Sequence, residues 1–169
     1  MSMYKQHRRH LVMALLGAGV IPALGGCGFQ LRQAPEFKFQ KLWLGGSSEV
    51  LVYLRKELRQ ASDRVMIVPR PQDAEVLLQI VSDERKEVSV GQTPSGQVRE
   101  IQMRATVVFR LWVQGQDPAV TETEIEQFRE YSYSETQALA KDDEKDLLFA
   151  DMSKVIAQQL LWRLTSIQP

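Results

Sequence analysis

The sequence is poor in the residues on which most catalytic and metal sites depend. Its 169 residues include one cysteine and two histidines, and both histidines, His7 and His10, lie within the first ten positions. One cysteine cannot form an internal disulfide and cannot supply a multi-cysteine metal site. If the N-terminal segment is removed, no imidazole remains for Ser-His-Asp or Cys-His catalysis or for histidine-ligated zinc. We therefore expect a protein that is not an enzyme and has no catalytic residues, metal or cofactor.

The sequence also lacks an excess of charge of either sign. Lys and Arg number 21, as do Asp and Glu, so the formal net charge is zero and the chain as a whole is not attracted to nucleic acid. No P-loop lysine motif and no glycine-rich dinucleotide loop occurs. A hydrolase that uses carboxylates alone remains open, although acidic side chains on solvated faces are the simpler interpretation. We expect no nucleic-acid partner.

The longest apolar run is short and lies near the N-terminus. It extends from Leu11 to Leu24 after a polar, basic segment, and it is shorter than the about 20 apolar residues that span a bilayer. This arrangement predicts a secretory signal peptide over residues 1–26. The run closes with a Leu-Gly-Gly-Cys sequence ending at Cys27, which resembles the lipobox of bacterial lipoproteins; an ordinary buried cysteine is the alternative. The resemblance implies cleavage before Cys27 and lipidation of that residue with diacylglycerol and a further acyl chain such as palmitate, and Gly28 favours the outer membrane.

Removal of residues 1–26 would change the charge balance. The 143 residues that remain hold 18 basic and 21 acidic side chains, a formal charge of −3, and no histidine. We expect residues 27–169 to form a single domain whose first part, residues 27–36, is a tether. Several acyl chains on Cys27 would anchor the protein stably, whereas one chain gives only marginal membrane binding.

Apolar residues recur at two periods along the rest of the chain. Alternation predicts strands at 37–44, 74–90, 98–113 and 120–135, with a short strand-like piece at 65–68. Helical spacing predicts one helix that starts after a cap at Ser47 or Ser48 and ends near Ser62-Asp63, and a second from about 139 to 166. In the first strand, Phe37, Phe39 and Trp43 share one face. Trp43 and Trp162 are expected in the core, Tyr131 and Tyr133 in the core or against a partner, and Arg85 and Lys86 on a solvated face.

This order of elements predicts an α+β fold. We expect a two-layer α/β sandwich in which about four mainly long antiparallel strands, within a mixed sheet, are covered by two helices. Strands of about 15 residues run about 50 Å at about 3.3 Å per residue, more than a small core needs. The hairpin that turns at 91–96 is therefore expected to project beyond the helices toward a partner, with a merely solvated hairpin as an equal alternative.

Two segments resemble the family of LPS-assembly lipoproteins, LptE. Residues 27–32, Cys-Gly-Phe-Gln-Leu-Arg, are similar to the family's opening, and residues 138–144, Ala-Leu-Ala-Lys-Asp-Asp-Glu, are the more specific match. With the Gln-Gln-Leu-Leu-Trp-Arg-Leu run at 158–164, the resemblance covers essentially the whole chain from Cys27. Gln33, where many relatives carry glycine, and the turn at 92–96 depart from the family pattern.

The resemblance implies a role in lipopolysaccharide transport at the cell outer membrane. Such lipoproteins form a heterodimer with the large β-barrel LptD, sit in its lumen as a plug, support its assembly and are implicated in binding lipopolysaccharide. The implied location is lipid-anchored at the inner leaflet of the outer membrane, facing the periplasm and within the barrel lumen. The alternative is a free periplasm-facing lipoprotein that binds an amphiphile or another envelope complex.

The resemblance and the hairpin together name candidate binding residues. Lys141 matches the motif lysine and is a candidate for binding lipopolysaccharide, whose phosphates attract an ammonium group; pairing with nearby acids is the alternative. Arg99 and Arg104 flank the hairpin and are further candidates, with ordinary exposed charges as the alternative for each. The candidates for contact with the barrel are the turn residues Gln92, Thr93, Pro94, Ser95 and Gly96.

Overall fold

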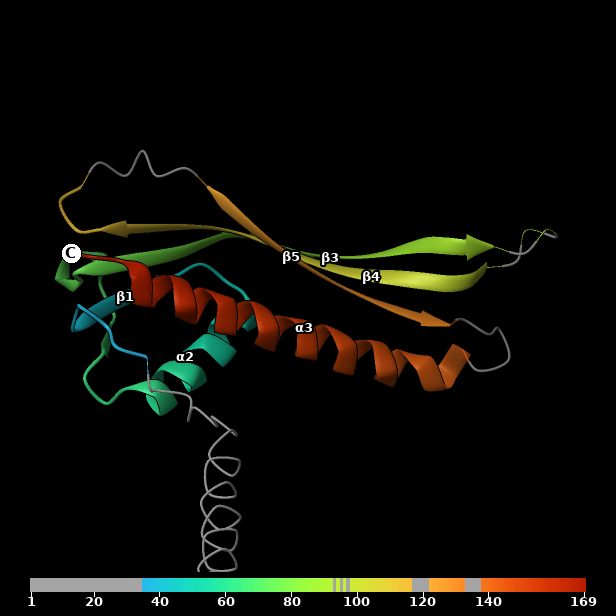
Figure 1. Ribbon diagram of the computed structural model, residues 1–169, viewed down its shortest axis with the longest axis horizontal. Coiled ribbons are helices and arrows are strands. Elements are labelled where there is room, and N and C mark those ends of the chain that lie inside the picture. The colour runs from blue at the N-terminus through green and yellow to red at the C-terminus, as the bar shows by residue number, and fades with distance from the viewer. Residues whose placement is uncertain (1–34, 93, 95, 97, 117–121, 133–137) are drawn as a thin grey trace, which may run out of the picture. The chain divides into compact units, whose positions relative to one another are not determined.

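The computed structural model describes residues 35–92, 94, 96, 98–116, 122–132 and 138–169, with the backbone alone at 98, 99 and 138–142. It has an α+β fold, as predicted: a five-stranded mixed sheet with two α-helices on one of its faces (Figure 1). The elements are, in order, β1 (Lys41–Gly45), α2 (Glu49–Ala61), β2 (Met66–Val68), the 3-10 turn η2 (Pro71–Asp73), β3 (Val76–Gln92), β4 (Val98–Val113), β5 (Thr123–Ser132) and α3 (Ala138–Ser166).

The sheet combines a short parallel part with a long antiparallel part. Its strand order is β2-β1-β3-β4-β5, and β1 runs parallel to both of its neighbours. From β3 onward the pairing is antiparallel, and β3 and β4 are 17 and 16 residues long. The expectation of mainly long antiparallel strands in a mixed sheet is thus confirmed. Because β1 reaches only the first residues of β3, the long β3–β4–β5 ribbon continues past it.

The first strand differs from the prediction. β1 begins at Lys41 rather than at residue 37, and Leu42 and Leu44 face the main core, where Phe39 is also buried. Trp43 faces the opposite way and is half-buried against a small second cluster of Val68, Ala74 and Leu77. A strand between two parallel neighbours is covered on both faces, so its run of apolar residues carries no clear period of two.

The helix α2 starts at a capping serine, and the chain just before it lies very close to β3. The Ser48 hydroxyl accepts a hydrogen bond from the Val50 amide at 3.0 Å, which satisfies one of the free N–H groups of the first turn. Just before it, Gly46 has φ +94°, and a Cβ there would lie 2.4 Å from the carbonyl oxygen of Ile80. Only glycine allows the chain to pass so close to β3 before it enters the helix.

A β-bulge at Val81 reverses which side of β3 faces the helices. Ile80 pairs with Phe109, but the next pair is Ser82 with Val108, so Val81 is an extra residue on β3. An insertion of one residue exchanges the two faces of a strand. Before the bulge the alternate apolar residues of β3 face the helices, and after it the residues that do so are Asp83, Arg85 and Glu87.

The main core lies between the helices and the sheet on the side of β1. Its most deeply buried side chains, all essentially inaccessible to solvent, are Leu42, Leu51, Leu54, Leu58, Leu78, Phe109, Met152, Ile156, Leu160 and Leu164. We call β1, α2, Val76–Ile80, Val107–Val113 and Met152–Ser166 the proximal half. We call Asp83–Gln92, Val98–Ala105, Gln127–Ser132 and Ala138–Asp151 the distal half.

Two sequence expectations about exposure need correction. Trp162 was expected in the core, but it is 48% exposed, because the apolar face of α3 consists of Met152, Ile156, Leu160 and Leu164. The hairpin was expected to project beyond both helices. It passes α2, but α3 has 29 residues, spans about 44 Å at about 1.5 Å per residue, and runs beside the hairpin over most of its length (Figure 1). Tyr131 is buried in the core, and Tyr133 lies outside the described residues.

Candidate functional site

The structure brings two of the three predicted lipopolysaccharide-binding residues to one end of the molecule. Lys141 lies in the first turns of α3 and Arg99 is the second residue of β4, each described by its backbone. Glu100 pairs with Ser132 at the end of β5, and α3 begins six residues later. Figure 1 shows the start of α3 and the β3–β4 turn at the same end, which we call the distal end.

The predicted barrel-contact turn also lies at the distal end. Gln92 is the last residue of β3 and is exposed, as are Pro94 and Gly96 in the turn. Gly96 has φ +82° and open space around it, so its role is to permit the turn. Thr93 and Ser95 lie outside the described residues.

Arg104, the third candidate, belongs to a different surface. Its partners in the sheet place it on the face turned away from the helices, whereas α3, with Lys141, covers the other face. Its Nε donates a hydrogen bond of 2.6 Å to the Gln102 side chain, and a terminal nitrogen lies 3.7 Å from a Glu126 carboxylate oxygen. The structure therefore separates Arg104 from Lys141 by the thickness of the sheet, and the three cations do not form one site.

The uncovered face of the antiparallel ribbon, which we call the outer face, is rich in charge. Three cross-strand rows succeed one another along it: Glu84, Thr106 and Glu126, then Lys86, Arg104 and Phe128, then Val88, Gln102 and Glu130. The Lys86 ammonium lies 2.6 Å from the Glu84 carboxylate, and this pairing holds the pKa of Glu84 below its ordinary value and that of Lys86 above its own. Lys86 is thus on a solvated face, as predicted.

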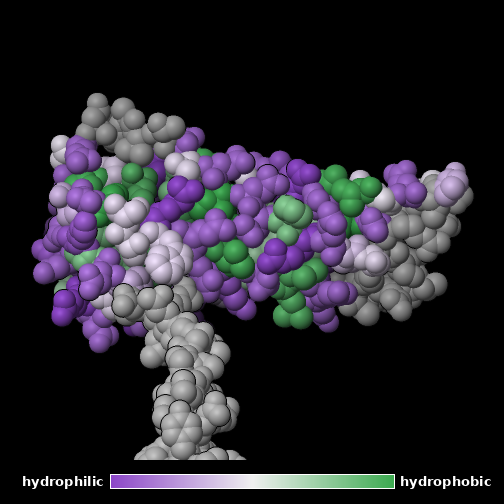
Figure 2. Space-filling model, in the orientation of Figure 1, coloured by the Kyte–Doolittle hydropathy of each residue, from purple (hydrophilic) through white to green (hydrophobic). Residues whose placement is uncertain are grey.

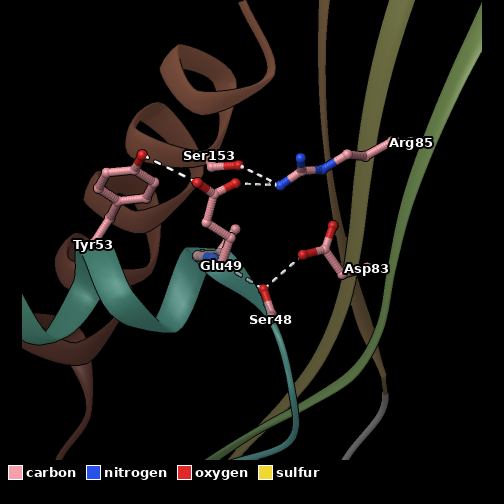
Figure 3. A network of polar contacts seen from close by, with 7 residues as sticks. Ser48, Glu49, Tyr53, Asp83, Arg85 and Ser153 are labelled. Atoms are coloured by element: carbon pink, nitrogen blue, oxygen red, sulfur yellow. Dashed lines mark hydrogen bonds and ion pairs between the residues drawn. The ribbon is translucent and has the colours of Figure 1, made fainter. Parts of the chain in front are cut away.

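Arg85 was also expected on a solvated face; it is partly exposed, but the face on which it lies is the one that meets the helices. Its guanidinium forms an ion pair with Glu49 at the start of α2 and lies 3.4 Å from the hydroxyl of the buried Ser153 of α3. The same group stacks over the Phe149 ring, 5.4 Å from the ring centre. Figure 3 shows Arg85 reaching from β3 toward both helices. Because the Val81 bulge turns this side chain inward, Arg85 connects all three elements.

Neighbouring polar side chains extend the contacts of Arg85 into a network (Figure 3). The Ser48 hydroxyl donates a hydrogen bond of 2.7 Å to the Asp83 carboxylate, so the cap of α2 is tied to β3 (Figure 3). The Tyr53 hydroxyl donates one of 3.2 Å to Glu49. Burial raises the pKa of Tyr53, with the nearby Glu49 carboxylate adding to the effect, so Tyr53 stays protonated as the donor at neutral pH.

Two further ion pairs join the layers in the distal half. The Lys145 ammonium of α3 lies 3.1 Å from a Glu87 carboxylate oxygen, and the Arg129 guanidinium of β5 lies 3.1 Å from Asp151 of α3. The sequence pattern gave no sign of these contacts. The run at 83–87 is charged at every position, so its sequence does not show which residues face the helices, and the bulge at Val81 decides that Asp83, Arg85 and Glu87 do.

The described part of the chain shows no arrangement suited to metal chemistry. Among the residues that the structure describes, no group of three or more His, Cys, Asp and Glu side chains is placed to hold a metal ion. No helix within these residues is long and apolar enough to cross a membrane. Cys27, the predicted lipid attachment site, lies outside them.

The relatives found by comparison with known proteins share one family name. The family model described as "Lipopolysaccharide-assembly", LptE, matches residues 39–164, more than half of the chain. The chain is 30% identical over 167 residues to the LPS-assembly lipoprotein LptE of Pectobacterium atrosepticum, covering 95% of this chain and 88% of that protein. It is also 30% identical over 163 residues to the LPS-assembly lipoprotein LptE of Yersinia enterocolitica, covering 93% and 76%.

Two solved structures share the fold. The solution NMR structure of an uncharacterized lipoprotein B from Nitrosomonas europaea has a TM-score of 0.70 and 27% identity, covering 82% of this chain and 91% of that chain. The crystal structure of the rare lipoprotein B from Shewanella oneidensis has a TM-score of 0.64 and 27% identity, covering 75% and 94%.

Proposed function

The chain belongs to the LptE family of lipopolysaccharide-assembly lipoproteins, and from this premise we propose that it plugs, and helps to assemble, the outer-membrane β-barrel LptD. As a member of this family it is an envelope lipoprotein with a role in lipopolysaccharide transport and assembly. The proposal adds the partner, the heterodimer with it, and the location within the barrel lumen. The observation that carries it is the family match over nearly the whole described fold.

The surface of the fold supports a place in a polar lumen. The lumen of a large outer-membrane barrel is polar, so a plug needs a mixed-charge exterior without a large apolar area. Figure 2 shows, on the face in view, mainly hydrophilic side chains with small, separate apolar groups between them. The outer face of the sheet is likewise composed mainly of charged and amide side chains.

Attachment to the membrane is the second element of the proposal. Cleavage of residues 1–26 leaves Cys27 as the N-terminal residue, and its acyl chains insert into the inner leaflet of the outer membrane. Two or more chains hold a protein stably at a bilayer. We propose that residues 27–36 act as the tether between the acylated cysteine and the folded part.

Contact with lipopolysaccharide is the third element, and we place it at the distal end. By their backbone positions, Lys141 in the first turns of α3 and Arg99 at the start of β4 both belong to this end. Two cations at one end attract the phosphates of lipid A or the acidic sugars of the core. Arg104 is a weaker candidate, because Gln102 and Glu126 already engage its guanidinium.

Co-purification tests the proposed partner. The tagged full-length protein is extracted from bacterial membranes in a mild detergent, beside an unrelated tagged outer-membrane lipoprotein as control. We expect a large β-barrel to be recovered in a fixed ratio with this protein and to be absent from the control. Recovery of the lipoprotein with no barrel, or with an amphiphile or another envelope complex instead, would contradict the proposal and favour the free lipoprotein.

A further inference from the structure

The outer face of the antiparallel ribbon is a surface with no cover in the described structure. Both helices pack on the other face, where Met103, Ala105 and Val107 of β4 are buried. The alternate residues of β4 and β5 therefore face away from them. The second cluster around Trp43 covers only the start of β3. Among the described residues, no element packs on the outer-facing side chains Glu84, Lys86 and Val88 or on their cross-strand partners in β4 and β5.

An aromatic side chain lies in the middle of this surface. Phe128 is 56% exposed, and its cross-strand neighbour is Arg104, which in turn lies opposite Lys86. Aromatic residues and arginine are the types most enriched at the energetic centres of protein interfaces. An exposed phenylalanine surrounded by polar groups also matches the pattern of an apolar anchor inside a polar rim.

The charge around Phe128 is negative along the edge of the sheet. β5 is the edge strand, and Glu124, Glu126 and Glu130 lie on its outer face within about 20 Å, at about 3.3 Å per residue. Arg104 approaches Glu126 only to 3.7 Å, and Glu130 accepts a hydrogen bond of 2.8 Å from the Gln102 amide. The cation of β5, Arg129, pairs with Asp151 on the helix side. The outer face of β5 therefore carries an excess of carboxylates, and the nearest cations on this face are Arg104 and Lys86 in the row of Phe128.

This charge distribution selects among the possible occupants. Antiparallel pairing of β5 with the β5 of a second copy would set carboxylates against carboxylates, which is unfavourable, and charged edges are a known protection against such pairing. Anionic lipid headgroups are repelled for the same reason. A protein surface that presents lysine or arginine side chains can pair with the carboxylates and can also cover the exposed ring of Phe128.

We infer that the outer face of β4 and β5, centred on Phe128 and the carboxylates of Glu124 and Glu130, is the surface that docks against a cationic protein wall. The inference rests on the proposed function, in which that wall is the lumen side of the barrel. The two faces of the sheet then have different roles. The face that packs on the helices stabilises the fold, and the outer face contacts the barrel. The lipopolysaccharide candidates Lys141 and Arg99 stay at the distal end, outside this surface.

A charge reversal tests the surface in the assembled complex. The tagged full-length lipoprotein is produced with its barrel partner as the wild type and as the double variant Glu124→Lys/Glu130→Lys, and the barrel recovered per lipoprotein is measured. The control, Glu36→Lys/Asp63→Lys, makes the same change of charge at two exposed acids that lie outside both the outer face and the distal half. We expect the double variant to recover about tenfold less barrel and the control to match the wild type.

The folded state of each variant is checked by its far-UV circular dichroism. If the lysine double variant does not fold, the milder Glu124→Gln/Glu130→Gln variant replaces it, with an expected loss of about threefold. Equal recovery by a folded variant and the wild type would overturn the inference and leave the proposed function intact. A wild-type protein that recovers no barrel would overturn both.

Discussion

The two halves of the fold are held together by different forces. In the proximal half, α2 and α3 pack on the sheet through leucine, isoleucine and phenylalanine side chains with essentially no solvent access. The distal half also buries apolar side chains, namely Met103, Ala105, Tyr131 and Phe149. Its part of β3, however, meets the helices through Asp83, Arg85 and Glu87, which pair with Ser48 and Glu49 at the start of α2 and with Lys145 of α3. Apolar burial is not weakened by charge screening, whereas partly exposed ion pairs contribute little and are screened by salt. The proximal half therefore supplies most of the stability, and the distal half is the part free to serve partners.

The largest expected effect is the loss of a proximal core side chain. Leu54→Ala removes a fully buried leucine of α2 and is expected to lower the free energy of unfolding by about 3 kcal/mol, from lost burial and the cavity left behind. Denaturant unfolding followed by circular dichroism measures it. The matched control is Val52→Ala, two residues away and 60% exposed, with an expected change below about 0.5 kcal/mol. Similar losses in both variants would remove the proximal half as the main source of stability.

The next effect concerns binding at the distal end rather than stability. Lys141→Asp reverses a charge that we expect to contact lipopolysaccharide phosphates, and affinity is expected to fall about tenfold, the scale of one charge-assisted contact. Titration with fluorescently labelled lipopolysaccharide measures the affinity. Lys56→Asp makes the same change on the exposed side of α2 and is expected to bind as the wild type. Unchanged binding by folded Lys141→Asp would remove this residue from the site.

A moderate effect is expected from the residue that joins β3 to both helices. Arg85→Ala loses the ion pair with Glu49 and the contact with the Phe149 ring, and is expected to cost about 1 kcal/mol, a figure limited by the partial exposure of the pair. A double-mutant cycle with Glu49→Ala should give a coupling of about 0.5 kcal/mol that decreases in about 1 M salt. A coupling of zero at low salt would show that the distal ion pair does not contribute.

The smallest effect is a pH dependence on the outer face. Lys86 lowers the pKa of Glu84 below its ordinary value of 4.5, so the pairing stabilises the folded state above that value. The contribution is lost as the pH falls through the lowered pKa, because the folded state must then bind the proton. The melting temperature of Glu84→Gln should therefore lie slightly below that of the wild type at pH 7 and approach it in acid. A difference that is constant with pH would exclude this titration.

The sequence predicts most of the proximal half and less of the distal half. Helical spacing through Leu54 and Leu58 and alternation through Val76, Leu78 and Ile80 are strong because one face of each element is buried. The position of Arg85 could not be predicted, because a single extra residue at Val81 exchanges the faces of β3 without leaving a pattern in the composition. The prediction that Phe37, Phe39 and Trp43 share one face failed for a related reason, because β1 is covered on both sides.

The candidate site, too, was predicted from the sequence only in part. The motif at 138–144 names Lys141 as a candidate, which stays a prediction, and the long strands correctly predicted a hairpin that passes α2 but not that α3 runs beside it. Sequence spacing placed Arg99 and Arg104 together as residues that flank the hairpin. The structure places Arg104 on the outer face, where its neighbours across the strands decide its environment, and describes Arg99 by its backbone alone. Phe128 was missed, since one exposed aromatic in an acidic strand has no signature without knowledge of which face is covered.

Hydrogen exchange followed by mass spectrometry tests the central claim, that the proximal half holds the fold and the distal half with the outer face meets the partner. Backbone amide exchange is compared between the free lipoprotein and its complex with the barrel, both as full-length proteins in the same detergent. We expect added protection in β5, in the neighbouring part of β4 and at the start of α3, with little change in α2 and in the second half of α3. Protection confined to α2 and the proximal core, with β5 unchanged, would contradict the account.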